Sequence, residues 1–222
     1  MGGRAKTAIA ALFLALTVAD AVVIQQYNPN SATAATEAQT PAAAVGKPAP
    51  DFTLTDSNGK PHSLSQYKGK FLVLEWVNFD CPFVKKHYGS GNMQKLQEKY
   101  VAKGVEWLSI NSSAPARQGH YPPAKINELL KSHNSHASAY LIDDNGKVGR
   151  MYGATATPHM FVIDKKGTLV YAGAIDDKPT VDEGDIGNAK NYVAAALDEV
   201  MAGKPVVTAQ TQAYGCSVKY QK

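Results

Sequence analysis

Residues 71–88 read FLVLEWVNFDCPFVKKHY. The segment before Cys81 is nearly continuous in apolar and β-favouring residues, which predicts a central strand covered on both faces. Helical spacing begins after Cys81, and Pro82 suits the first helical turn because its missing N–H is not needed there. The stretch therefore predicts a strand that leads a thiol to the N-terminus of a helix. The partial positive charge and free N–H groups at that end favour the thiolate, the nucleophilic form of cysteine.

Turn signals and periodicity divide the rest of the chain into alternating strands and helices. Alternating apolar residues around the Asp56–Gly59 turn predict a short hairpin ahead of the main sheet. Helical spacing continues to about Ala102, and Gly89–Gly91 is expected to split it into two pieces. The other predicted elements are strands at 105–113, 139–142, 159–164 and 168–173, and helices at 124–133 and 189–203. This order predicts an α/β fold with a central mixed sheet flanked by helices, an N-terminal hairpin and a C-terminal tail.

The N-terminal residues resemble a secretory signal peptide, with Arg4 and Lys6 ahead of a short apolar segment. Asp20 interrupts that segment before it reaches membrane-spanning length. Small residues at 19–21 offer a cleavage site, which makes residues 1–21 the signal peptide, and a later site lies at 32–34. An uncleaved N-terminal anchor is the alternative. The protein is expected to be exported to the periplasm or another extracytoplasmic space, and to contact a membrane only if this segment is not cleaved.

Composition separates three further segments. Residues 22–47 are rich in small residues and proline without periodicity, which is typical of a flexible linker. Residues 48–203 are long enough for one domain with its own core, and residues 204–222 form a C-terminal tail that carries Cys216. The net charge is +4, but the lysines are scattered and no basic stripe is interleaved with aromatic residues. Nucleic-acid binding is therefore not expected.

Three motifs in the correct order carry a family resemblance. Residues 49–84 resemble the opening of the thioredoxin-like redoxins, the superfamily that includes peroxiredoxins and membrane-tethered thiol-disulfide oxidoreductases. Residues 154–173, which begin ATATPHMF, resemble the segment of that fold that carries its cis-proline. Residues 214–220, YGCSVKY, resemble the C-terminal cysteine motif of an AhpC/TSA-type, peroxiredoxin-like branch. The resemblance implies a thioredoxin-like fold over roughly residues 47–220.

The resemblance also implies roles for individual residues. Cys81 corresponds to the nucleophilic cysteine at the start of the first core helix, and the alternative is a buried, inert cysteine. Thr157 and Pro158 match the cis-proline loop, whose backbone pairs with an extended substrate segment; an ordinary trans turn is the alternative. Glu75 corresponds to the buried acidic residue of thioredoxins, with a raised pKa and a proton relay to the active-site sulfur as its expected properties. Alternatively, Glu75 points to a sheet end and pairs with a lysine.

The sequence departs from three standard patterns around Cys81. Val84 stands where the C-x-x-C motif of thioredoxins has its second cysteine, so a local dithiol is impossible. Leu74 and Asn78 stand where the peroxiredoxin pattern has proline and threonine, which weakens the peroxidase interpretation without excluding it. Lys85 stands where a copper chaperone of this fold has a cysteine, so a thiolate copper site is not expected. No metal site and no cofactor are predicted.

Cys216 is the only other cysteine and therefore the only intramolecular partner for Cys81. The tail after Gly203 can extend roughly 40 Å, so it can reach the active site. In a catalytic role, Cys216 closes on a Cys81 mixed disulfide or sulfenic acid and releases the product. In a static role, a disulfide pins the tail, and closing so long a loop stabilises the fold by about 5 kcal/mol in the chain-entropy model.

Four basic or titratable side chains lie near these motifs. Lys85, Lys86 and His87 follow Cys81 within two helical turns, and a positive charge there would lower the pKa of the thiol. The alternative is an ordinary solvated helix face. His159 follows Pro158 and either tunes the thiolate or is packed away from it.

Three functions remain open at this point. The first is an exported thiol-disulfide oxidoreductase that acts on protein or small-molecule disulfides through Cys81, with Cys216 as its partner and an unidentified redox protein as electron donor or acceptor. The second is a thiol peroxidase, a peroxiredoxin-like antioxidant that reacts with hydroperoxide. The third is a non-enzymatic binding module in which the two cysteines form a structural disulfide.

Overall fold

The computed structural model describes residues 1–3 and 43–221 of the 222-residue chain. The predicted signal peptide, with both of its cleavage sites, and the predicted linker up to residue 42 lie outside the described residues. Among the residues that are described, no helix combines the length and the apolar character needed to cross a membrane.

One seven-stranded mixed sheet forms the centre of the folded unit, in the order β2-β1-β5-β4-β3-β7-β8. The central strand β3 pairs parallel with β4 and antiparallel with β7, and all of its residues are buried, as its continuous apolar run predicts. The strands are β1 (Thr53–Asp56), β2 (Pro61–Ser63), β3 (Leu72–Trp76), β4 (Glu106–Asn111), β5 (Ala139–Ile142), β7 (His159–Ile163) and β8 (Leu169–Gly173). The predicted hairpin forms, but it extends the main sheet at one edge, because β1 pairs antiparallel with β5.

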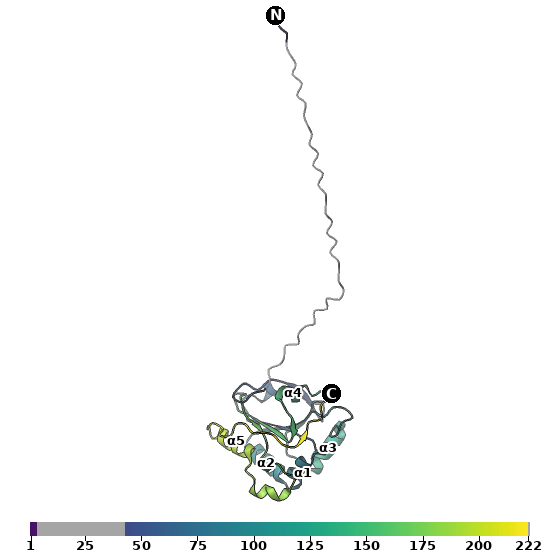
Figure 1. Ribbon diagram of the computed structural model, residues 1–222, viewed down its shortest axis with the longest axis vertical. Coiled ribbons are helices and arrows are strands. Elements are labelled where there is room, and N and C mark those ends of the chain that lie inside the picture. The colour runs from purple at the N-terminus through teal and green to yellow at the C-terminus, as the bar shows by residue number, and fades with distance from the viewer. Residues whose placement is uncertain (4–42, 222) are drawn as a thin grey trace. The chain divides into compact units, whose positions relative to one another are not determined.

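Helices cover both faces of the sheet, which confirms the predicted architecture (Figure 1). The helices are α1 (Pro82–Gly89), α2 (Asn92–Val101), α3 (Pro123–Ser132), α4 (Lys147–Tyr152) and α5 (Tyr192–Met201), with short 3₁₀ helices at Leu64–Tyr67 and Glu183–Asn188. The α1–α2 break occurs as predicted, because Gly91 adopts a left-handed conformation with φ of 74°. The six-residue helix α4 was not predicted, since one and a half turns carry too little periodicity to be recognised.

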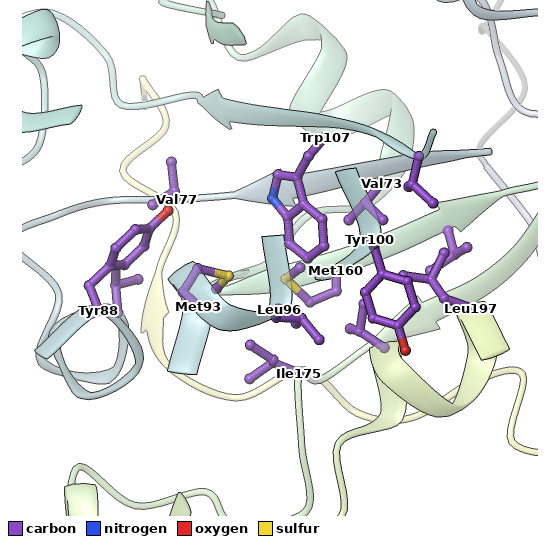
Figure 2. Packing of buried hydrophobic residues seen from close by; sticks show 14 of the residues in the cluster. Val73, Val77, Tyr88, Met93, Leu96, Tyr100, Trp107, Met160, Ile175 and Leu197 are labelled. Atoms are coloured by element: carbon purple, nitrogen blue, oxygen red, sulfur yellow. The ribbon is translucent and has the colours of Figure 1, made fainter. Parts of the chain in front are cut away.

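Alternation along β3 builds two hydrophobic clusters, one on each face of the sheet. Val73 and Val77 point toward α1, α2 and α5, where Figure 2 shows Met93, Leu96 and Met160 packed among the aromatic rings. Leu72, Leu74 and Trp76 point the other way, toward the cluster that includes α4. Glu75 has the same parity as Val73 and Val77, so its carboxyl group enters the first cluster.

The C-terminal tail returns across the domain and pairs with it at two places. Residues 209–211 exchange backbone hydrogen bonds with Ala172 of β8. Further on, the two-residue strand β9 (Cys216–Ser217) pairs antiparallel with β6 (Ala156–Thr157). These pairings bring Cys216 to the segment that contains Pro158.

Candidate active site

Cys81 lies at the junction between β3 and α1. It is the N-cap residue of α1, and its carbonyl accepts the first helical hydrogen bond, from the backbone N–H of Lys85 at 2.9 Å. Pro82 occupies the first helical turn, as predicted. The Cys81 side chain is fully buried, with 0% of its surface exposed. The sequence thus positions the thiol at the positive end of the helix, but the fold covers it.

The Thr157–Pro158 loop packs directly against this thiol. The Thr157–Pro158 peptide bond is cis, as predicted. The thiol of Cys81 donates a hydrogen bond to the carbonyl oxygen of Thr157 at 3.1 Å. The two segments singled out by the sequence, 76 residues apart, therefore meet at one point.

Cys216 reaches the same point from the tail. Strand β9 pairs with β6 in a register that sets Cys216 opposite Thr157, the residue whose carbonyl oxygen accepts the hydrogen bond from the Cys81 thiol. Gly215 makes this approach possible: it has φ of 133°, and a Cβ atom there would lie 2.1 Å from the Thr157 carbonyl oxygen. Both cysteines are free thiols in this structure, Cys81 buried and Cys216 partly exposed.

The two thiols have opposite pKa shifts. Burial alone would raise the pKa of Cys81, but hydrogen-bond donors that favour its thiolate, namely the side chains of Cys216 and Thr157 and the backbone amides of Val84 and Cys216, together lower it. Burial, together with the hydrogen bond and the charge of Cys81, raises the pKa of Cys216 to about 11, although Lys219 acts in the opposite direction. Cys81 is therefore the more acidic thiol of the pair and the better leaving group in disulfide exchange.

Glu75 is fully buried beneath this site, on the same face of the sheet. Desolvation raises the pKa of its carboxyl group, as predicted, although four hydrogen bonds partly oppose the shift. The donors are Trp107 Nε1 at 2.8 Å, Ser109 Oγ and Tyr88 Oη at 3.2 Å each, and Gln97 Nε2 at 3.3 Å. The alternative that Glu75 pairs with a lysine at a sheet end is wrong, because all four partners are uncharged. None of these bonds involves Cys81, so the proton relay stays a prediction.

Glu75 is expected to make the stability of the fold pH-dependent. The unfolded chain releases the Glu75 proton near its ordinary pKa of 4.5, whereas the folded chain holds it to a higher pH. The free energy of unfolding should therefore fall as pH rises from 4.5 to the folded pKa, with a limiting slope of about 1.4 kcal/mol per pH unit. Glu75→Gln should remove that slope in urea denaturation measured across this pH range.

Glu106→Gln is the matched control for that experiment. The Glu106 carboxylate pairs with Lys70 at 2.6 Å between Oε1 and Nζ, and although burial opposes it, this contact lowers the pKa of Glu106. Its contribution to stability should therefore have the opposite sign and be lost as pH falls. A Glu75→Gln protein whose free energy of unfolding follows the wild type at every pH would show that folding does not shift the pKa of Glu75.

A buried polar cluster holds the tail immediately before Cys216. The hydroxyl of Tyr214 donates to Asp176 Oδ1 and lies 3.3 Å from Nε2 of His87. Asn92 Nδ2 lies 2.9 Å from Nδ1 of His87, which assigns the His87 proton to Nε2 and directs it at Tyr214. The ring of Tyr214 also makes an edge contact with Phe83, at 5.8 Å between centroids. We call His87, Asp176 and Tyr214 the tail clasp.

Tyr214→Phe is expected to loosen the tail. The substitution removes one of the hydrogen bonds to Asp176, whose Oδ2 atom is already buried without a hydrogen bond. The loss should cost about 1–3 kcal/mol in tail docking and raise the alkylation rate of Cys81 at least several-fold. Peptide mapping by mass spectrometry after brief N-ethylmaleimide treatment measures this. Tyr192→Phe, on the neighbouring helix α5, is the control, and equal protection of Cys81 in both variants would contradict the clasp.

The basic residues after Cys81 do not form one solvated face. Lys85 is exposed, as that interpretation requires, but Lys86 and His87 are buried, with 1% and 0% exposure. The Lys86 ammonium group donates to the carbonyl oxygen of Lys178 at 2.8 Å. His159 is packed away: Thr155 N–H donates to its Nδ1, its ring stacks on Phe161, and burial lowers its pKa to about 4.

Sequence reasoning missed the donors around Glu75 and the tail clasp. Their members come from separate elements, and a single tyrosine, glutamine or histidine in a helix carries no signal of burial by itself. Gly215 was the one available signal, because a glycine directly before a cysteine in a tail suggests a close backbone approach. Among residues 1–3 and 43–221, no group of three or more potential ligands (His, Cys, Asp or Glu) has an arrangement suited to a metal ion.

Comparisons with known proteins agree with this geometry. A family model described as Redoxin matches residues 44–191. Thiol-disulfide oxidoreductase ResA of Geobacillus thermodenitrificans (strain NG80-2) is 32% identical over 129 residues, which is 58% of this chain and 68% of the relative. A hypothetical protein from Sinorhizobium meliloti 1021 is 27% identical, with a TM-score of 0.68 over 81% of this chain and 96% of its own. An uncharacterized conserved protein from Geobacillus kaustophilus is 28% identical, with a TM-score of 0.69 over 80% of this chain and 93% of its own.

Proposed function

The chain belongs to the redoxin family and has a thioredoxin-like fold, and we propose that it is a thiol-disulfide oxidoreductase whose redox pair is Cys81 and Cys216. The observation that carries this proposal is that both cysteines meet the cis-proline loop at Thr157, Cys81 by a hydrogen bond to its carbonyl oxygen and Cys216 by strand pairing, with the more acidic thiol at the N-terminus of α1. In this chain the second cysteine comes from the tail instead of the position three residues after the first. The pair therefore depends on the β6–β9 pairing.

The proposed exchange has two steps. The Cys81 thiolate attacks one sulfur of a substrate disulfide, forms a mixed disulfide, and expels the other substrate sulfur as a thiolate. Cys216 then loses its proton and attacks the Cys81 sulfur, which forms the Cys81–Cys216 disulfide and expels the second substrate thiolate. The substrate gains two electrons and the enzyme loses two. Thr157 and Pro158 are proposed to contact the substrate, and Glu75 to exchange protons with the site.

Substrate access is the constraint on this scheme. The backbone edge at Thr157, which would pair with an extended substrate, is occupied by the chain's own β9. A protein disulfide would reach Cys81 only after β9 has moved aside, whereas a small disulfide needs less room. The proposed substrates are thus protein or small-molecule disulfides and thiols, with a separate redox protein as the exchange partner.

A thiol peroxidase is the second candidate, and one observation favours it. A fully buried, acidic thiol admits a hydroperoxide more easily than a protein disulfide. In that case Cys81 is oxidised to sulfenic acid, water or an alcohol leaves, and Cys216 condenses with the sulfenic acid and releases water. An antioxidant role and a place in the peroxiredoxin-like branch would follow. Asn78, where peroxiredoxins have threonine, counts against it.

Export is part of the proposal. The basic and apolar N-terminal segment and the two cysteines fit an oxidising, extracytoplasmic compartment such as the periplasm. Fractionation of cells that express the full chain, with N-terminal sequencing of the product, tests this and locates the cleavage site.

Stopped-flow kinetics distinguishes the candidate functions. The reduced chain is mixed with glutathione disulfide or with hydrogen peroxide, and tryptophan fluorescence and quenched mass spectra follow the Cys81–Cys216 disulfide. We expect this disulfide to form with release of two glutathione molecules per chain. Peroxide oxidation of Cys81 far faster than that of an ordinary thiol would favour the peroxidase. If the Cys81–Cys216 disulfide resisted reduction at the potentials where redox-active dithiols open, both the oxidoreductase and the peroxidase would be excluded. The remaining function would be a binding module with a structural disulfide.

A further inference from the structure

The more acidic of the two thiols is not the more exposed one. Cys81 has the lowered pKa but no exposed surface, whereas Cys216 is partly exposed and has a raised pKa. In a C-x-x-C site both properties belong to one sulfur. Their separation here makes the two sulfurs of the oxidised pair chemically unequal toward an incoming thiol.

The tail that covers Cys81 is anchored on both sides of Cys216. The tail clasp holds it before Cys216. After Cys216, the Val218 N–H donates to the Thr155 carbonyl, and the hydroxyl of Tyr220 donates to the Ala154 carbonyl at 2.7 Å. Tyr220 lies against Gly149, where a Cβ atom would be 2.4 Å from its hydroxyl oxygen. Strand β9 is therefore held in place on both sides of Cys216 and forms one side of the active site.

A disulfide between Cys81 and Cys216 would tie strand β9 covalently to the active site. Both cysteines already lie at Thr157, Cys81 through the hydrogen bond of its thiol to the Thr157 carbonyl oxygen and Cys216 through the strand register, so their disulfide is expected to form with β9 still paired to β6. Once the bond exists, β9 cannot leave Cys81 until the bond is broken. Cys81 is fully buried and Cys216 partly exposed in the reduced protein, and a β9 that stays paired would keep this difference in the oxidised protein.

We propose that the thiol that reduces the Cys81–Cys216 disulfide, and so restores the reduced enzyme, attacks the sulfur of Cys216 rather than that of Cys81. This inference rests on the proposed redox pair. A thiolate of a small thiol or of a dithiol protein bonds to the Cys216 sulfur, the Cys81–Cys216 bond breaks, and its electron pair leaves on Cys81. A second thiolate of the reductant then attacks the reductant's sulfur in the mixed disulfide and expels Cys216, which takes a proton from water. The reductant is oxidised to its disulfide, and both enzyme cysteines are reduced.

The leaving-group chemistry agrees with the geometry. Disulfide exchange is faster when the departing thiol has the lower pKa, and attack at Cys216 expels the more acidic Cys81. Attack at Cys81 would instead expel Cys216, whose pKa is about 11. Lys219, which lowers the pKa of Cys216, also supplies a positive charge near the attacked sulfur.

A trapping experiment on the wild-type chain tests the proposal. Oxidised protein is mixed with glutathione, the reaction is stopped at short times by an excess of N-ethylmaleimide, which alkylates every free thiol, and the peptides are mapped by mass spectrometry. We expect glutathione on the peptide that contains Cys216 and N-ethylmaleimide on the peptide that contains Cys81. Glutathione found only on Cys81, or equally on Cys81 and Cys216, would show that the reductant does not prefer Cys216. That result would leave the proposed Cys81–Cys216 redox pair intact. A disulfide that glutathione cannot open would overturn the redox pair as well.

A charge substitution gives an independent readout. At low ionic strength Lys219→Gln should lower the rate of reduction by glutathione, relative to the rate with 2-mercaptoethanol, by about twofold to fivefold, because the glutathione thiolate carries more negative charge. Lys204→Gln, an exposed lysine at the start of the tail, is the control and should leave the ratio unchanged. If Lys219→Gln also left the ratio of the glutathione rate to the 2-mercaptoethanol rate unchanged, the result would contradict the proposal that the thiolate attacks at Cys216.

Discussion

Cys81→Ser is expected to lower the rate of disulfide exchange by about a thousandfold or more, because a serine hydroxyl is not ionised at neutral pH. The remaining thiol, Cys216, cannot substitute for it. Its raised pKa leaves little thiolate at pH 7, and it does not lie at the N-terminus of a helix. Turnover of a disulfide substrate by the purified full chain, with a thiol reductant in excess, measures the loss.

Cys216→Ser is the matched variant, and it should block the second step of the exchange, whereas Cys81→Ser blocks the first. Cys81 still attacks the substrate disulfide, but no second thiol resolves the mixed disulfide, so one substrate half stays attached per chain. Intact-mass spectrometry detects this adduct. If Cys216→Ser turned over like the wild type, Cys216 would have no catalytic role. If neither variant lost activity, another mechanism would have to carry the exchange.

Gly215→Ala is expected to separate the two cysteines without altering either of them. A Cβ atom at this position would lie 2.1 Å from the Thr157 carbonyl oxygen, so β9 must move away from β6. Cys216 would then act from a flexible tail, and its effective concentration at Cys81 would fall from that of an oriented pair to the millimolar range of a flexible tether. Closure of the Cys81–Cys216 disulfide should slow by about tenfold to a hundredfold. Quenched-flow alkylation after addition of a substrate disulfide measures that rate.

Gly59→Ala is the control for this variant. Gly59 also has a positive φ, 81°, but no atom lies within 4 Å of the position that a Cβ atom would take. The control therefore carries the backbone strain of a left-handed alanine without the clash, and disulfide closure should keep the wild-type rate. Equal closure rates in Gly215→Ala and the wild type would mean that strand pairing is not what brings Cys216 to Cys81.

The fold and half of the site were predictable because they depend on local signals. The continuous apolar run of β3, the proline after Cys81 and the glycines between α1 and α2 each act within a few residues. The same holds for the strands of the β7–β8 hairpin, which lie where the turn at 165–167 predicts them. These signals also locate Cys81 at the start of a helix.

The partners of the site residues were not predictable, because they are brought together from distant parts of the chain. The donors to Glu75 lie up to 34 residues away, on α1, α2 and β4. Lys86 and His87 were assigned to solvent as one alternative, since charged helix residues usually lie there, yet the returning tail and the segment around residue 178 cover them. No periodicity in the tail indicated this return.

Cys81 shows where the two kinds of information divide. Its neighbours in sequence determine that it is a cysteine at a helix N-terminus after a buried strand, because helix capping and strand burial are set by residues within one or two turns. Only the tertiary structure decides that it is covered, hydrogen-bonded and paired with Cys216. Those properties arise from a two-residue strand pairing between segments 59 residues apart, and the contacts that stabilise it exist only once the whole domain has folded.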